Sequence, residues 1–104
     1  MSNFWQITDI MVKKTIWKVH LNLVDGWQAV VLPGYAGVAL VAPQEGELHV
    51  WVHVDKSGLE KTVNFKVTGT GHPSPEDGKH VGSVIMRPFV WHVWEFDDSS
   101  IINI

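Results

Sequence analysis

The sequence predicts an all-β protein, either a small antiparallel β sandwich or a barrel of six to seven strands. Residues 47–54 and 62–68 alternate between apolar and polar side chains, which is the pattern of a strand with one buried face. No stretch has the apolar period of an amphipathic helix. Turn-forming glycines separate the candidate strands at intervals of about 8–12 residues, as in small sandwiches and barrels. They are Gly26, Gly34, Gly46, Gly58 and Gly69.

A single domain accounts for the chain. Its 104 residues are near the commonest domain size, and no change in composition marks a linker. Residues 1–11 show no clean period, and a second methionine, Met11, precedes Lys13 and Lys14. We therefore expect an N-terminal extension over residues 1–13 and a single β domain over residues 14–104.

Composition excludes several classes of function. The chain has no cysteine, which rules out disulfides and thiolate chemistry. Its formal net charge of −3 lacks the basic footprint of a protein that binds duplex nucleic acid. No apolar run approaches the roughly 20 residues that span a bilayer, so we expect no membrane partner. Six tryptophans and a hydrophobic content of 45% imply either a dense core or an apolar surface for a partner.

The first strands are expected to form a hairpin. Residues 15–23 alternate strictly, and Trp17 falls on the apolar side, which places it in the core. Asp25-Gly26 is a turn sequence. We therefore expect residues 27–32 to return beside the first strand and to end at Pro33-Gly34.

The middle strands have assignable faces. Residues 38–41 predict a short buried strand that ends at Ala42-Pro43. In residues 47–54, the side chains expected to point inward are Leu48, Val50, Val52 and Val54, and those expected to point outward are His49, Trp51 and His53. In residues 62–68, the inward set is Val63, Phe65 and Val67, with polar residues between them.

The end of the chain contains the longest loop and the last strand pair. Residues 69–79 hold three glycines and two prolines and cannot continue a strand. Residues 82–86 and 89–96 are then expected to pair around Arg87-Pro88. The final strand is apolar on both faces, which predicts that it is central and doubly buried or covered by another subunit.

The histidines of residues 47–54 do not make a metal site by themselves. His49 and His53 lie four residues apart, roughly 13 Å along a strand. A site would need ligands from neighbouring strands, and no His-x-His pair and no nearby ligating carboxylate completes one. We expect no metal and no other cofactor.

The sequence also lacks the usual patterns of an active site. It has no cysteine nucleophile and no Gly-x-Ser-x-Gly elbow. The carboxylate pairs Glu76-Asp77 and Asp97-Asp98 are adjacent in sequence, and neither faces itself across a cleft as general acid–base catalysis requires. We therefore predict no catalytic residues and no enzyme activity.

The densest polar cluster lies at the start of the long loop. Gly69 and Gly71 allow the backbone to approach a ligand closely, and Thr70 and His72 add donors. Loop residues with these properties indicate a ligand site. The plainer alternative is a shaped turn between two strands.

Two tryptophans are expected to be outside the core. Trp51 lies on the outward face beside His53, and Trp94 shares its face with His92. Outward tryptophans either bury into a homo-oligomeric interface or stack on a planar ligand such as a nucleobase. A tryptophan can have both roles where a ligand pocket lies between subunits.

Four segments of the sequence resemble a family of small phage-encoded proteins of largely unknown function. They are residues 14–18 (KTIWK), 48–55 (LHVWVHVD), 65–73 (FKVTGTGHP) and 90–96 (VWHVWEF). The resemblance covers about residues 14–96, and its specific part is the Gly-Thr-Gly-His-Pro loop. The family is similar to viral sponge proteins that sequester cyclic nucleotide signals of bacterial antiphage defence. Such sponges are small, oligomeric and non-catalytic, and they hold a dinucleotide in pockets between subunits.

The resemblance implies that the chain evades CBASS-like immunity in the host bacterial cytoplasm. We expect a homo-oligomer, dimer or tetramer, that binds a nucleotide ligand, with a phosphate near Lys66 or Arg87. The alternatives are a protein-interaction module that inhibits a host protein through an aromatic face and a metal-dependent small barrel enzyme. The ligand-binding residues chosen on physical grounds are Trp51, His53, Lys66, Gly69, Thr70, Gly71, His72, Arg87 and Trp94.

Overall fold

A computed structural model describes residues 12–97 and confirms the all-β prediction. Among these residues the chain forms seven strands and no helix, so no helix of the described part could cross a membrane. The strands are β1 (Lys14–Leu21), β2 (Gln28–Pro33), β3 (Val38–Gln44), β4 (Glu47–Asp55), β5 (Glu60–Gly69), β6 (Lys79–Met86) and β7 (Phe89–Asp97). Most of the expected extension, residues 1–11 of 1–13, lies outside the described residues.

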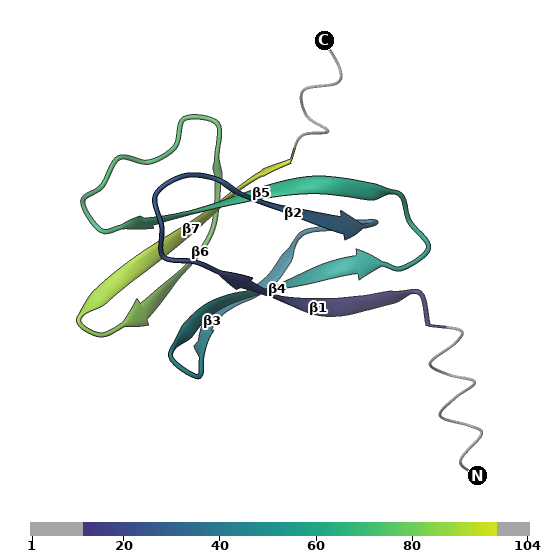
Figure 1. The fold of residues 1–104 in the computed structure, drawn as a ribbon, viewed down its shortest axis with the longest axis horizontal. Helices are drawn as coiled ribbons and strands as arrows, with labels where there is room; N and C mark the ends of the chain where they lie inside the picture. The colour runs from purple at the N-terminus through teal and green to yellow at the C-terminus, as the bar shows by residue number, and fades with distance from the viewer. Residues whose placement is uncertain (1–11, 98–104) are drawn as a thin grey trace.

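The strands form two antiparallel sheets (Figure 1). One sheet has the order β1-β4-β3 and the other the order β2-β5-β7-β6. The apolar faces of the two sheets pack on each other, so the fold is a small β sandwich. Each sheet therefore keeps an outer face, and the two outer faces carry the side chains considered below.

The core contains the inward residues that the alternation predicts. Leu48, Val50, Val52 and Val54 of β4 are no more than 2% exposed. On the facing sheet, Val63 and Phe65 of β5 and Val93 of β7 are fully buried. Because alternate residues of a strand point to opposite faces, this burial fixes which side chains point outward.

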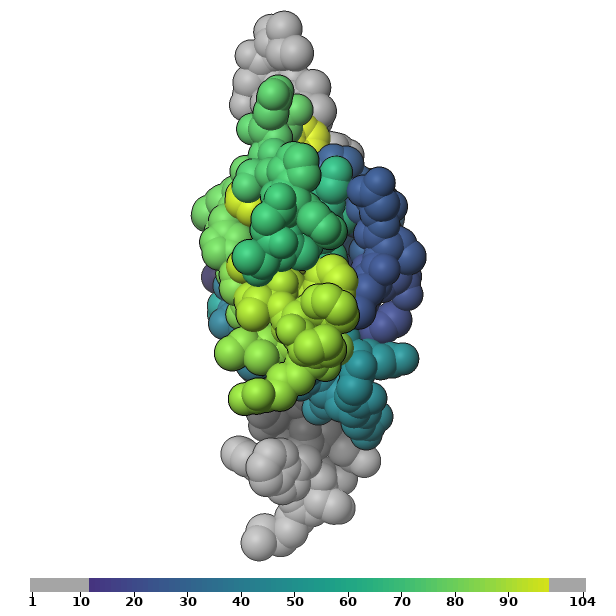
Figure 2. Space-filling model, turned by 90° about the vertical axis from the view of Figure 1, so that its left-hand side faces the viewer, coloured from purple at the N-terminus to yellow at the C-terminus, as the bar shows by residue number. Residues whose placement is uncertain are grey.

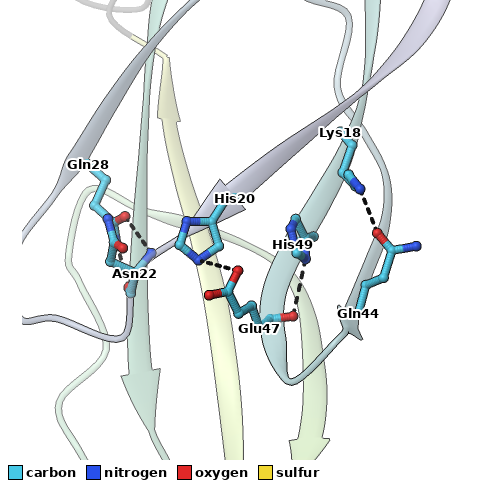
Figure 3. Close-up of polar contacts among 7 residues, drawn as sticks. All are labelled: Lys18, His20, Asn22, Gln28, Gln44, Glu47 and His49. Atoms are coloured by element: carbon cyan, nitrogen blue, oxygen red, sulfur yellow. Dashed lines mark hydrogen bonds and ion pairs between the residues drawn. The ribbon is translucent and has the colours of Figure 1, made fainter.

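The expected hairpin of residues 15–23 and 27–32 is wrong. β1 ends at Leu21 and pairs with β4, whereas β2 begins at Gln28 and pairs with β5. The chain therefore crosses between sheets at residues 22–27, because both apolar faces must cover the same core from opposite sides. Two hydrogen bonds hold this crossing: the Asn22 amide donates to Gln28 Oε1 at 2.8 Å, and Gln28 Nε2 donates to the Asn22 carbonyl at 2.7 Å (Figure 3).

Trp17 and residues 38–41 were predicted to be buried, and both predictions are wrong. Trp17 is on the core side of β1, opposite Val52, but it is 39% exposed because β1 is an edge strand that the other sheet does not fully cover. The strand expected at 38–41 runs on to Gln44, and Leu40 on its outer face is 52% exposed. β3 tolerates Pro43 because it too is an edge strand, where a missing amide donor costs little.

Gly82 allows the edges of the two sheets to come together. β3 and β6 are edge strands of different sheets, and they lie against each other. A Cβ atom at position 82 would lie 2.6 Å from Val41 Cγ2, which is closer than real Cβ atoms approach. Glycine at this position therefore permits the contact that closes one side of the sandwich.

β7 is central in its sheet, lying between β5 and β6, but the expected burial on both faces is wrong, since Val90 on its outer face is 37% exposed. Its core face includes Val93 and also Glu95, whose carboxylate accepts a hydrogen bond from the Tyr35 hydroxyl. Burial raises the pKa of Tyr35 above its usual value, and the hydrogen bond and negative charge of Glu95 raise it further. The outer face of β7 carries His92 and Trp94.

Candidate ligand-binding site

The long loop between β5 and β6 folds against the outer face of the four-stranded sheet. At its start, the His72 amide donates to the Gly69 carbonyl at 3.1 Å, and the Gly69 amide donates to His72 Nδ1 at 3.3 Å. At its end, a Cβ atom at Gly78 would lie 3.2 Å from Trp27 Cη2 and 3.3 Å from Trp94 Cβ. Figure 2 shows this loop in green above the yellow-green residues of β6 and β7.

A cavity of about 330 Å3 lies between this loop and the sheet. We call it the histidine cleft, and its lining residues are Thr68, Gly69, Thr70, Gly71, His72, Ser74, His80, His92 and Trp94. Gly71 adopts a φ of +88°, a conformation that L side chains rarely take, and a Cβ atom there would meet nothing within 4 Å. Two larger hollows, of about 610 and 420 Å3, adjoin the cleft at Gly69 and His72.

A chain of hydrogen bonds forms one wall of the cleft. Thr70 Oγ1 lies 2.9 Å from His92 Nε2, and His92 Nδ1 lies 2.6 Å from Ser83 Oγ. Ser83 Oγ lies in turn 2.9 Å from His80 Nε2. Both nitrogens of His92 are therefore engaged, and the loop is tied through this ring to β6 and β7.

Trp94 is held in one orientation at the base of the cleft. Its indole nitrogen donates to Thr68 Oγ1 at 2.9 Å, and the His80 ring lies 5.0 Å from its ring, centre to centre. Thr68 lies on the outer face of β5, opposite His92, but it is only 7% exposed because the loop covers it. A tryptophan fixed in this way loses little side-chain entropy when a flat ligand packs on it.

A second aromatic cluster continues along the same outer face. Trp27 and Phe96 have ring centres 6.1 Å apart, and Lys66 Nζ lies 5.8 Å from the centre of the Trp27 ring. Lys66 of β5 is also the direct cross-strand partner of Trp94. The cation is therefore on the same face as the cleft and next to its tryptophan.

The structure brings together six of the nine residues expected to bind a ligand. Five of them line the histidine cleft, and Lys66 lies beside it. Arg87 does not line the cleft; it lies in the β6–β7 turn, where Pro88 lines the adjoining hollow of about 420 Å3. The five in the cleft are Gly69, Thr70, Gly71, His72 and Trp94.

Trp51 and His53 lie elsewhere, on the outer face of the three-stranded sheet. His53 lines a separate hollow of about 530 Å3 beside Asp55. The Ser57 hydroxyl donates to the Asp55 carboxylate at 2.7 Å and the Ser57 amide at 2.9 Å, and these bonds lower the pKa of Asp55. A single ligand therefore cannot contact both Trp51 and Trp94 of one chain.

Sequence reasoning missed His80, Ser83 and His92 as site residues. His92 could have been predicted, because it lies two residues from Trp94 and therefore shares its face of the strand. His80 and Ser83 were not recoverable by simple alternation, because the register of β6 shifts between His80 and Gly82. This bulge turns both side chains toward His92.

The cleft offers hydroxyl and imidazole groups that can form hydrogen bonds with a polar ligand. Ser83 Oγ is shared by two imidazoles, which is an arrangement that can move a proton between neighbouring groups. The partner of His92 on its other side is the Thr70 hydroxyl, not a carboxylate that would stabilise an imidazolium. The geometry is therefore better suited to holding a ligand by hydrogen bonds than to activating Ser83.

The fold and the cleft define a seven-stranded antiparallel β sandwich with one loop folded against an outer sheet face. The chain belongs to the family described as a domain of unknown function (DUF7352), whose model matches residues 12–101. No curated protein and no solved structure matches the chain.

Proposed function

We propose that this protein binds a nucleotide signal, of the cyclic dinucleotide class, at the histidine cleft and sequesters it without transforming it. The observation that carries the proposal is the cleft itself, which combines a fixed tryptophan, a glycine-containing loop and a wall of imidazoles and hydroxyls. A planar base and a phosphate ester are the two chemistries that such a set of groups recognises together.

Each part of a nucleotide has a suitable neighbour. Trp94 offers an aromatic surface to the base, and Lys66 supplies a positive charge on the same sheet face. Gly71 brings backbone amide groups close to the cleft without a side chain in the way. Because His72 Nδ1 accepts from the Gly69 amide, the neutral ring carries its proton on Nε2 and can donate to a phosphate oxygen.

The size of the cleft supports an oligomer. A volume of about 330 Å3 is at the low end for a drug-sized ligand, and a dinucleotide is larger. Apolar side chains are exposed on the same outer face toward the turn between β6 and β7, where the cross-strand partners Ile85 and Val90 are 67% and 37% exposed. We propose that a second chain packs there and completes the pocket, in a dimer or tetramer.

The biological role rests on the resemblance of residues 14–96 to a family of small phage-encoded proteins, which is in turn similar to viral sponge proteins. A protein that binds a defence signal and does not release it lowers the free concentration of that signal in the infected bacterium. We propose this role, evasion of CBASS-like immunity, for the chain.

The proposal is tested by screening cyclic dinucleotides against the purified full chain in a thermal-shift assay. A ligand at a hundredfold excess over its Kd adds about 2.7 kcal/mol to the free energy of unfolding. That corresponds to a shift in Tm on the order of 10 °C for a chain of this size. Native mass spectrometry then gives the ligand bound, unaltered, and the number of chains. Binding of no nucleotide in the panel would contradict the proposal.

A second candidate is inhibition of a host protein through the outer face of the three-stranded sheet. There Leu40, the cross-strand partner of the partly buried Trp51, is 52% exposed, and Ile16, opposite His53, is 49% exposed. A substitution of Leu40 by Lys would abolish such binding and leave nucleotide binding intact. Capture of a host protein by the parent and not by Leu40→Lys, with no nucleotide bound by either, would favour this candidate.

A further inference from the structure

A pair of histidines faces outward from the three-stranded sheet, away from the histidine cleft. His20 of β1 and His49 of β4 are direct cross-strand partners, and Figure 3 shows both with Glu47. Their ring centres are 5.4 Å apart, and the rings are inclined by 55°. This pairing exists because β1 joins β4 rather than β2, so the sequence pattern alone did not reveal it.

The ring nitrogens of His20 and His49 contact a carboxylate and a backbone carbonyl rather than hydroxyl groups. His49 Nδ1 lies 3.1 Å from the Glu47 carbonyl oxygen and donates to it, which leaves the lone pair on Nε2. His20 Nε2 lies 3.5 Å from Glu47 Oε2. A backbone carbonyl that fixes one ring nitrogen is the usual outer partner of a metal-binding histidine.

The spacing of the two rings suits a shared metal ion. When two imidazoles bind one tetrahedral ion at about 2.0–2.1 Å, their ring centres lie about 5.2 Å apart. The observed separation of 5.4 Å is close to this value. In the same geometry two ligand atoms lie about 3.3–3.4 Å apart, near the 3.5 Å between His20 Nε2 and Glu47 Oε2.

We propose that His20 Nε2, His49 Nε2 and the Glu47 carboxylate form a binding site for a divalent transition-metal ion, with water as the fourth ligand. Two imidazoles and a carboxylate are a common donor set for Zn2+, and imidazole also suits Cu2+ and Ni2+. As the side chains stand, no three His, Asp or Glu groups within residues 12–97 surround a common point. Binding therefore requires the Glu47 side chain, which is 62% exposed, to turn its carboxylate toward His49.

Other histidines of the chain make a useful contrast. The His80 and His92 rings are 6.0 Å apart, but both nitrogens of His92 and Nε2 of His80 are already hydrogen-bonded. A metal ion bound by His92 would have to break at least one of these bonds. His53 shares a strand and an outer face with His49 but lies roughly 13 Å away, opposite Ile16.

The test is a calorimetric titration of the full chain with Zn2+, repeated for four variants. We expect saturable binding of one Zn2+ per chain. Affinity should fall at least about tenfold in His20→Gln and in Glu47→Gln, because losing even an outer partner of a metal ligand costs that much. His49→Gln should behave likewise once circular dichroism shows that it folds, and His53→Gln is the matched control with unchanged affinity.

Cu2+ provides a second readout. The Trp51 ring lies 5.9 Å from the His49 ring, so Cu2+ bound at the site should quench the fluorescence of Trp51. The quenching should disappear in His20→Gln, whose side chain is exposed and whose fold is not at risk, and be smaller in Trp51→Phe. Absence of saturable Zn2+ binding, or an equal loss in His53→Gln and His20→Gln, would overturn the proposal. The site uses no residue of the histidine cleft, so its failure says nothing about nucleotide binding.

Discussion

The two outer faces of the sandwich each carry a close pair of histidines, and the pairs differ in what surrounds them. On the four-stranded sheet, Ser83 and Thr70 occupy both nitrogens of His92. On the three-stranded sheet, His20 and His49 have a carboxylate and a backbone carbonyl beside them. The first pair is therefore part of a polar wall, whereas the second can donate lone pairs. Neighbouring donors and acceptors, rather than ring spacing, decide what a histidine pair can bind.

Coverage also differs between the faces. The long loop folds against the outer face that carries Trp94 and buries Thr68 there, which produces a cavity. Nothing comparable within residues 12–97 covers Leu40, which is 52% exposed. A cavity suits a small ligand, and an exposed apolar face suits a partner surface.

The largest expected effect is on the scaffold that both faces share. Gly82→Ala should lower the free energy of unfolding by about 2–3 kcal/mol, because the new Cβ atom overpacks against Val41. Urea unfolding monitored by circular dichroism measures this. In a Val41→Gly background, which lacks both atoms that the new Cβ atom would crowd, Gly82→Ala should cost clearly less. Equal costs in both backgrounds would show that this contact does not hold the sheet edges together.

The second effect distinguishes the two tryptophans. Trp94→Ala should weaken cyclic dinucleotide binding by about tenfold to a hundredfold, since a stacked base contributes about 1–3 kcal/mol. Trp51→Ala, on the opposite outer face, is the matched control and should bind as the parent does. Titrations should record the oligomeric state as well. If Trp51→Ala loses affinity as much as Trp94→Ala while both keep their assembly, the assignment of the ligand to one face is wrong.

The third effect concerns Tyr35, which supports β7 from the core side. The pKa of Tyr35 is raised in the folded protein, so above the usual value of 10.0 the unfolded chain loses a proton that the folded chain keeps. The free energy of unfolding should then fall by about 1.4 kcal/mol per pH unit from this group.

The chain has a single tyrosine, so the effect is assignable. Urea unfolding of the parent and Tyr35→Phe at pH 9, 10 and 11 should show the steeper decline only in the parent. Parallel declines would mean that burial and the bond to Glu95 do not hold the Tyr35 hydroxyl protonated.

The sequence predicted strands and their faces better than it predicted which strands pair. Alternation gave the buried valines of β4 and β5, because one side of each strand must be apolar wherever a sheet has one buried face. It did not predict that β1 pairs with β4, because Asp25-Gly26 is compatible with both a tight hairpin and a longer crossing. Trp17 was misplaced for a related reason: exposure at a sheet edge depends on the neighbouring sheet, not on alternation.

Of the candidate site, the loop could be predicted from the sequence, but the residues of β6 that contact His92 beside it could not. Glycines, threonine and histidine in a loop are a local signal, and the structure brings Gly69 through His72 into one cleft. Ser83 and His80 are brought to His92 by a register shift in β6, and no residue type in β6 predicts this shift. The His20–His49 pair was not predicted because the sequence pattern placed the first strand beside residues 27–32. A cross-strand pair can be predicted only when it is known which two strands are neighbours.

The most direct test of the central claim, that the Gly-Thr-Gly-His-Pro loop binds the ligand, compares two glycines. Gly71 and Gly46 both have positive φ, +88° and +78°, and a Cβ atom at either would meet nothing within 4 Å. Valine should therefore strain both positions similarly, but only Gly71 lines the cleft.

Both variants should be titrated calorimetrically with the cyclic dinucleotide that gives the largest thermal shift, after circular dichroism shows that they fold. Gly46→Val should bind as the parent does, and Gly71→Val should lose about a hundredfold or more in affinity, equivalent to about 2.7 kcal/mol. Equal affinities of Gly71→Val and Gly46→Val would contradict the claim and reduce the loop to a turn between two strands.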